Sequence, residues 1–206
     1  PRPFLGRSAG PANQLKSFEP ETLTTYEIGF KTDLLGNRMR LNSAVFFNQY
    51  DDIILTLTAC PGPPCLQPNN VGEAEVKGVE VETEFHVTDN WLIDSSASFL
   101  DFEYTKLTGT TGVTPDMITP FTPEFKASIG LQYSHELGSS GRFIARVDAA
   151  YNDDMYALAI NAPTNLLDSY TVANARLTWR SQDNGWDTSL EVTNLTDEYF
   201  DVFGFD

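Results

Sequence analysis

The chain lacks several features that mark common classes of protein. Its 206 residues contain no run of 18 apolar residues, which excludes a membrane-spanning helix. Lys and Arg number 13 against 29 Asp and Glu, for a formal net charge of -16. Since nucleic-acid binding depends on cations that neutralise phosphates, this charge argues against a nucleic-acid partner.

Catalytic and metal-binding residue types are equally scarce. His86 and His135, the two histidines, each lie near an expected turn, where solvation explains them. Cys60 and Cys65, the two cysteines, fall in the turn-rich stretch ACPGPPCL without further His or Cys nearby. This spacing favours a disulfide across a small surface loop over a metal site. We therefore expect no enzyme, no cofactor and no bound metal.

The N-terminal stretch PRPFLG has neither an initiator Met nor a charged-then-apolar leader, so we expect a fragment or a processed piece of a longer protein. Helical periodicity is also absent, because apolar residues recur at every second position. That pattern predicts an all-β chain. We place about eight long strands at 23–34, 39–57, 75–88, 91–106, 124–137, 142–157, 169–181 and 186–199.

The connections between these strands alternate strictly between short and long. Short ones such as LLGNRM, VTDNW, ELGSSGR and SQDNGW are rich in Gly, Asn and Asp, as tight hairpins are. The long ones lie at about 57–74, 107–123 and 158–168. The alternation predicts an antiparallel up-and-down meander with turns at one edge and loops at the other.

In each predicted strand apolar and polar residues alternate, so one face of the strand is apolar and the other is polar. In VKGVEVETEFHV (76–87), Val79, Val81 and Phe85 alternate with three glutamates. A soluble sandwich would bury the apolar face, whereas a membrane barrel would turn it to lipid and the polar face to a hydrated lumen. Strands of about 11 residues span roughly 25 Å when tilted, which favours the membrane. The expected lumen-facing residues are Glu80, Glu82, Glu84, Arg146, Asp148 and Glu191.

Aromatic residues support the membrane interpretation. Trp91, Trp179 and Trp186 lie near the turn-bearing edge, and Tyr and Phe gather toward the opposite edge. Two aromatic girdles bordering an apolar band are typical of lipid–water interfaces. The second expected girdle comprises Tyr50, Phe99, Tyr104, Tyr151, Tyr156, Tyr199 and Phe200.

Four motifs occur in order along the chain: FEPETLTTYEIGFKTDLLGNRMRLNSAVFFNQYDDI (18–53), NNVGEAEVKGVEVE (69–82), TPEFKASIGLQY (122–133) and LEVTNLTDEYF (190–200). Together they resemble the late barrel strands of TonB-dependent outer-membrane receptors. The resemblance implies one partial barrel domain over 1–206, with 1–17 in an extracellular loop. It implies an open, curved segment of a 22-stranded transmembrane β-barrel, without the plug, the TonB-contacting segment or the final strand.

The resemblance also implies a function. Such a receptor takes up a ferric siderophore or a similar scarce nutrient across the outer membrane of a Gram-negative bacterium, with energy coupled through TonB. Expected partners are outer-membrane lipid, lipopolysaccharide, TonB through the plug, and a small ligand such as a metal chelate. Candidate ligand-binding residues at the extracellular rim are Asp51, Asp52, Tyr104, Asp153, Asp154 and Tyr156, for whose carboxylates simple solvation remains the alternative.

Two other functions stay open. Eight strands can close into a small barrel that acts as a passive pore or a structural protein. A soluble β-sandwich could instead bind ligands through its long loops. As a barrel segment, the sheet is expected to be open, with the first and last strands as unpaired edges.

Overall fold

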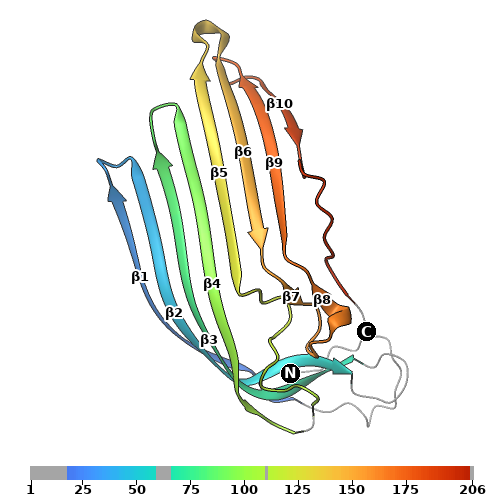
Figure 1. The fold of residues 1–206 in the computed structure, drawn as a ribbon. Helices are drawn as coiled ribbons and strands as arrows, with labels where there is room; N and C mark the ends of the chain where they lie inside the picture. The colour runs from blue at the N-terminus through green and yellow to red at the C-terminus, as the bar shows by residue number, and fades with distance from the viewer. Residues whose placement is uncertain (1–17, 59–65, 110, 205–206) are drawn as a thin grey trace.

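The computed structural model describes residues 18–58, 66–109 and 111–204, and its main feature is one antiparallel sheet of eight strands (Figure 1). The strands follow the order β1-β2-β3-β4-β5-β6-β9-β10, so neighbours in the chain are neighbours in the sheet. This confirms the predicted meander. The strands are β1 (Thr22–Leu34), β2 (Met39–Thr58), β3 (Leu66–His86), β4 (Trp91–Leu107), β5 (Phe125–Glu136), β6 (Arg142–Asn152), β9 (Tyr170–Arg180) and β10 (Asp187–Val192).

Smaller elements complete the described chain. A separate two-stranded sheet pairs β7 (Met155–Tyr156) with β8 (Leu166–Leu167). Two 3-10 helices of three residues each are η2 (Gly138–Ser140) and η3 (Pro163–Asn165). Across the three described ranges, none of the helices combines the length and the apolar character needed to cross a membrane.

The eight-stranded sheet is open. Within the described residues β1 pairs with β2 alone and β10 with β9 alone, and the ladder between the two edges that would close a small barrel is missing. Figure 1 shows a single curved layer whose two edge strands lie far apart. The expected unpaired edges are therefore confirmed, and the described chain does not form the self-closed eight-stranded barrel.

All four short turns lie at one edge of the sheet, as their sequences predict. Gly36 and Asn37 adopt φ values of 69° and 67° in the β1–β2 turn, a left-handed conformation that Gly and Asn tolerate best. In the β3–β4 turn, the Thr88 hydroxyl accepts hydrogen bonds from the amides of Asn90 and Trp91 at 3.2 and 3.1 Å. The long connections lie at the opposite edge, which we call the loop end (Figure 1).

Three strand boundaries differ from prediction by more than two residues. β3 begins at Leu66 instead of 75, because the β2–β3 ladder continues through the expected loop to the pair Thr58 and Leu66. β4 pairs with β3 only from Gly72 onward, so Pro68 lies in an edge segment of β3, where Pro is tolerated. β6 ends at Asn152 instead of 157, and Tyr156 belongs to the separate pair β7–β8.

The last strand is also shorter than predicted. β10 ends at Val192 instead of 199. Asn194 and Asp197 have φ values of 52° and 53°, which turn the chain out of the extended conformation. The Asn194 side chain then donates to the Glu198 carbonyl and accepts from its amide, both at 2.9 Å. This closed loop stops the ladder.

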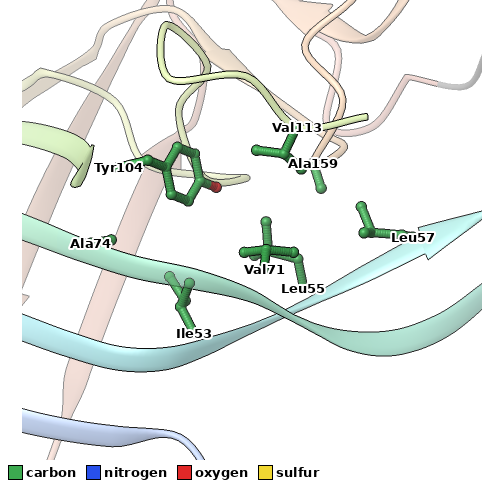
Figure 2. Packing of buried hydrophobic residues seen from close by; sticks show 8 residues of the cluster. All are labelled: Ile53, Leu55, Leu57, Val71, Ala74, Tyr104, Val113 and Ala159. Atoms are coloured by element: carbon green, nitrogen blue, oxygen red, sulfur yellow. The ribbon is translucent and has the colours of Figure 1, made fainter. Parts of the chain in front are cut away.

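The buried apolar residues gather at the loop end, not along the sheet. Figure 2 shows the cluster, in which side chains from β2 and β3 meet Tyr104 of β4, Val113 of the β4–β5 loop and Ala159 of the β6–β9 loop. Val71 is fully buried at its centre. The two long loops therefore fold onto the β2–β3 extension. The cluster consists of Ile53, Leu55, Leu57, Val71, Ala74, Tyr104, Val113 and Ala159.

Candidate functional site

The strand register sorts the side chains onto two faces. On the apolar face Val79 pairs with Val45 on one side and with Phe99 on the other, and Leu131 pairs with Val147 on the same face. Val79, Leu131 and Val147 keep exposed fractions of 41%, 42% and 52%. A soluble sandwich would bury these side chains against a second sheet, and in the described chain only the small β7–β8 pair exists besides this one.

The polar face carries most of the charged residues of the strands, although Lys77 and Asp101 pair with each other on the parity of Val79. The six residues predicted to share one face do so, since the register aligns Glu80 with Ser98, Asp148 with Gly130, and Glu191 with Arg176. Asn42 donates to Glu82 at 3.2 Å, and Asn174 donates to Asp148 at 2.9 Å. The face is thus held together by hydrogen bonds between side chains of neighbouring strands.

One ion pair on the polar face reaches across a whole strand. The Arg146 guanidinium on β6 donates two hydrogen bonds to the Asp94 carboxylate on β4, at 2.7 and 2.9 Å. Gly130 of β5 lies between the two, and a Cβ at that position would come within 2.2 Å of Arg146 Nη2. The absence of a side chain at Gly130 is what lets this bidentate pair form.

Aromatic pairs border the apolar face at both ends. Trp91 packs on Tyr133 at 4.8 Å between ring centroids near the turns, and Phe125 lies 5.9 Å from Tyr151 nearer the loop end. Two members of the expected second girdle do not belong to it. Tyr50 and Tyr104 lie on the polar face, because both pair with Ala74 of β3, which has the parity of Glu80.

The two long loops are fastened to each other. The Asn161 side chain accepts a hydrogen bond from the Ile118 amide at 2.7 Å and donates to the Ile118 carbonyl at 3.0 Å. The Phe121 amide donates to the Tyr156 carbonyl at 2.9 Å. Backbone groups of the β4–β5 loop are therefore satisfied by the β6–β9 loop, which makes one folded unit of the two.

Beneath this unit lies a cavity of about 430 Å³ on the polar side of the sheet. Its wall is formed by Phe46 and Asn48 of β2 and by Phe102 of β4, and Thr119 and Thr122 of the β4–β5 loop cover it. Asn48 of β2 and Phe102 of β4 both pair with Val76 of β3. Val76 lies on the same face of β3 as Glu80 and Glu82. The sequence alone does not predict this site. The signal that it offers is the presence of apolar residues, such as Phe46 and Phe102, at positions on the polar face between Gly78 and the loop end.

The predicted rim residues lie at the loop end but in different environments. Asp51 and Asp52 form an irregularity in the β2–β3 ladder, and Asp52 has a φ of 56°. Nearby, Lys106 Nζ contacts Glu73 at 2.6 Å. This hydrogen bond, with the charges of Glu73, Asp52 and Asp51, raises the pKa of Lys106. Both aspartates are exposed.

The other rim candidates are less accessible. Tyr104 is 4% exposed, and burial raises its pKa to about 12. Asp153 accepts hydrogen bonds from the Tyr151 hydroxyl and the Asp154 amide at 2.9 and 3.1 Å, so it caps the end of β6. Tyr156 is half-buried in β7, and Asp154 alone of these four is exposed. The structure does not gather the six rim candidates into one site.

Two further expectations concern cysteines and metals. Cys60 and Cys65 lie outside the described residues. Among the residues that are described, no three His, Cys, Asp or Glu side chains come together to hold a metal ion.

The chain's negative charge is concentrated at the loop end. The described segments there contain 16 acidic residues and one basic residue, Lys106, whereas the turn edge (31–40, 84–92, 134–144 and 178–189) has six acidic and five basic residues. The molecule is therefore strongly polarised along its strands. The loop-end segments are 18–22, 50–58, 66–76, 101–109, 111–124, 153–169 and 193–204.

Comparisons with known proteins agree with this architecture. The probable TonB-dependent siderophore receptor PiuA of Acinetobacter baumannii is 26% identical over 190 residues, which cover 88% of this chain and 24% of that protein. The ferrioxamine B receptor of Salmonella typhimurium is 25% identical over 186 residues, covering 88% of this chain and 25% of that protein. The chain thus spans about a quarter of the length of these relatives.

Solved structures give the same result. The ferric yersiniabactin uptake receptor FyuA of Yersinia pestis superimposes with a TM-score of 0.74 at 20% identity, over 93% of this chain and 27% of that one. The crystal structure of PiuA from Acinetobacter baumannii gives 0.67 at 25% identity, over 89% and 25%. The sequence also matches the family described as TonB dependent receptor-like, beta-barrel, over residues 2–195. The chain belongs to this family of TonB-dependent receptor β-barrels.

Proposed function

We propose that this chain is part of an outer-membrane receptor that takes up ferric siderophores or similar metal chelates, with energy supplied through TonB. The observation that carries the proposal is the inverted arrangement of the sheet, with apolar side chains exposed on one face and charged side chains on the other. Such a sheet is stable when lipid covers the apolar face and water fills the space beside the polar face. The relatives named above, a siderophore and a ferrioxamine receptor, support the substrate class.

In this proposal residues 1–206 belong to one partial barrel domain, and the extracellular loop expected at 1–17 lies outside the described residues. Glu80, Glu82, Glu84, Arg146, Asp148 and Glu191 face the lumen, where water satisfies the carboxylates that lack a cationic partner. The loop end faces the cell exterior of a Gram-negative bacterium, beside lipopolysaccharide. Asp51, Asp52 and Asp154, which are exposed, are available to a ligand at the extracellular rim.

The test is energy-dependent uptake by the whole receptor that carries this chain. Iron-limited cells expressing the receptor are given a panel of radiolabelled ferric chelates, in strains with and without functional TonB. The expected result is accumulation of at least one chelate that is abolished without TonB or after collapse of the proton gradient. Accumulation that is independent of TonB would instead indicate a passive pore, and no accumulation of any chelate would overturn the proposal.

A further inference from the structure

The cavity at the loop end has a chemical character that narrows the ligand. Its wall residues are largely uncharged, with Phe46 and Phe102 presenting aromatic surface and Asn48, Thr119 and Thr122 supplying polar groups. The Asn48 Oδ1 atom accepts no hydrogen bond within the part of the chain that the structure describes. A ligand portion that fits here is apolar or aromatic and carries an N–H or O–H donor.

The charge around the cavity is predominantly negative. Glu21 lines the cavity, and its carboxylate accepts a hydrogen bond from the Ile54 amide at 2.8 Å. Asp52 precedes Ile53 and Ile54, both of which also line the cavity. The described loop end carries 16 acidic residues and a single basic one. A surface of one sign attracts ligands of the opposite charge and repels those of its own.

We infer that this cavity binds a portion of a neutral or cationic ferric chelate, such as a hydroxamate complex with a free amine, and that the acidic loop end discriminates against anionic chelates. The inference rests on the proposed function and adds the charge class of the substrate. A chelate of tris-catecholate type is an anion, and it would have to approach the cavity through the field of these carboxylates. A cation is drawn in by the same field.

The experiment compares three ferric complexes of one linear trihydroxamate, which differ only at the terminal amine. The free amine makes the complex cationic, N-acetylation makes it neutral, and N-succinylation makes it anionic. Affinity for the whole purified receptor is measured at low and high ionic strength. We expect the anionic complex to bind at least about tenfold more weakly than the cationic one in dilute buffer, with the difference shrinking at about 0.5 M salt.

Variants separate the charge from the cavity. The triple variant E21Q/D51N/D52N removes three charges and keeps the acceptor of Glu21, and we expect it to narrow the preference for the cationic complex by roughly threefold. Asp89→Asn removes one charge at the turn edge and should leave the preference unchanged. Thr119→Trp fills the cavity and should weaken all three complexes at least about tenfold, whereas Thr105→Trp, exposed on β4 outside the cavity, should not.

The outcomes distinguish this inference from the function on which it rests. Equal or tighter binding of the anionic complex would overturn the inference, as would full affinity in Thr119→Trp. TonB-dependent uptake of a tris-catecholate without binding of any of the three hydroxamates would overturn it and leave the proposed function intact. Failure of every chelate in the uptake panel would overturn both.

Discussion

Arg146 and Asp94 form a bidentate ion pair that crosses over the intervening strand at Gly130. Their donor–acceptor distances of 2.7 and 2.9 Å are those of charge-assisted hydrogen bonds. The pair links β4 to β6, which share no backbone hydrogen bonds. It therefore adds a cross-strand connection that the ladder alone does not provide.

Gly130→Ala should disrupt this connection. The new Cβ would lie 2.2 Å from Arg146 Nη2 and 2.8 Å from Asp94 Oδ1, so the guanidinium must move. We expect the whole receptor to lose about 1–3 kcal/mol of stability, measured as a lower temperature of band conversion in heat-modifiability gels. Ser128 lies on the same strand as Gly130, and Ser128→Ala removes a 2.8 Å hydroxyl contact with Ser96 of β4 without creating a clash, so it should cost about 1 kcal/mol or less. Equal losses in both variants would contradict the account.

Asn161→Ala should release the β4–β5 loop from the β6–β9 loop. The substitution removes both hydrogen bonds to Ile118, so the amide and carbonyl of Ile118 must bond to water instead. We expect hydrogen exchange of residues 111–123 to accelerate roughly tenfold, which corresponds to about 1.4 kcal/mol of local opening, while the strands keep their protection. Asn69→Ala serves as the control, because the Asn69 side chain lies at the same end and, among the described residues, donates a hydrogen bond only to the Gln67 carbonyl two residues away. Unchanged exchange in Asn161→Ala would refute the fastening of the loops.

The β9–β10 turn should be sensitive to acid. The Asp183 carboxylate accepts hydrogen bonds from the Ser181 hydroxyl and the Gly185 amide, and these lower the pKa of Asp183 below its ordinary value of 3.8. A carboxyl with a lowered folded pKa contributes stability above the ordinary value, and this contribution is lost as pH falls through the lowered pKa. We expect the Gly185 amide resonance to shift with a midpoint below pH 3.8.

Asp183→Asn provides the matched control, because its amide oxygen still accepts hydrogen bonds but does not titrate in this range. The Gly185 resonance should then be independent of pH across the same interval. A titration that persists in this variant, or a midpoint at or above the ordinary value in the native chain, would show that Asp183 does not hold the turn.

Much of this fold follows from the sequence because a strand's period of two is a strong local signal. Leu131 and Val147 share one face and Glu80 and Glu82 share the other, as the alternation predicts. The tight turns follow from residues such as Gly36 and Asn37, whose backbones accept positive φ. The period alone does not distinguish a lipid-facing apolar face from a buried one, whereas strand length and the positions of the aromatic residues favour lipid.

The loop end was less predictable because its structure depends on contacts distant in sequence. The bulge at Asp51 and Asp52 shifts the register of the β2–β3 ladder. Beyond the bulge, the alternation of residues therefore no longer predicts which face a side chain lies on. The position of Tyr104 along its strand predicts a place at the rim, yet Tyr104 is buried in a cluster with Val113 and Ala159 from the two loops. Phe46 gives a readable hint, because an aromatic on the polar parity opposite Gly78 indicates a packed surface, and its ring does lie over that glycine.

The central claim is that the apolar face meets lipid and the polar face meets water. Nitroxide labels placed singly along β5 of the whole receptor in bilayers test it most directly. Positions 127, 129, 131 and 133 should relax faster with oxygen, which partitions into lipid, and positions 126, 128, 132 and 134 should relax faster with a water-soluble nickel chelate. An inverted pattern, or protection of the first set from both reagents as in a dry protein core, would contradict the account.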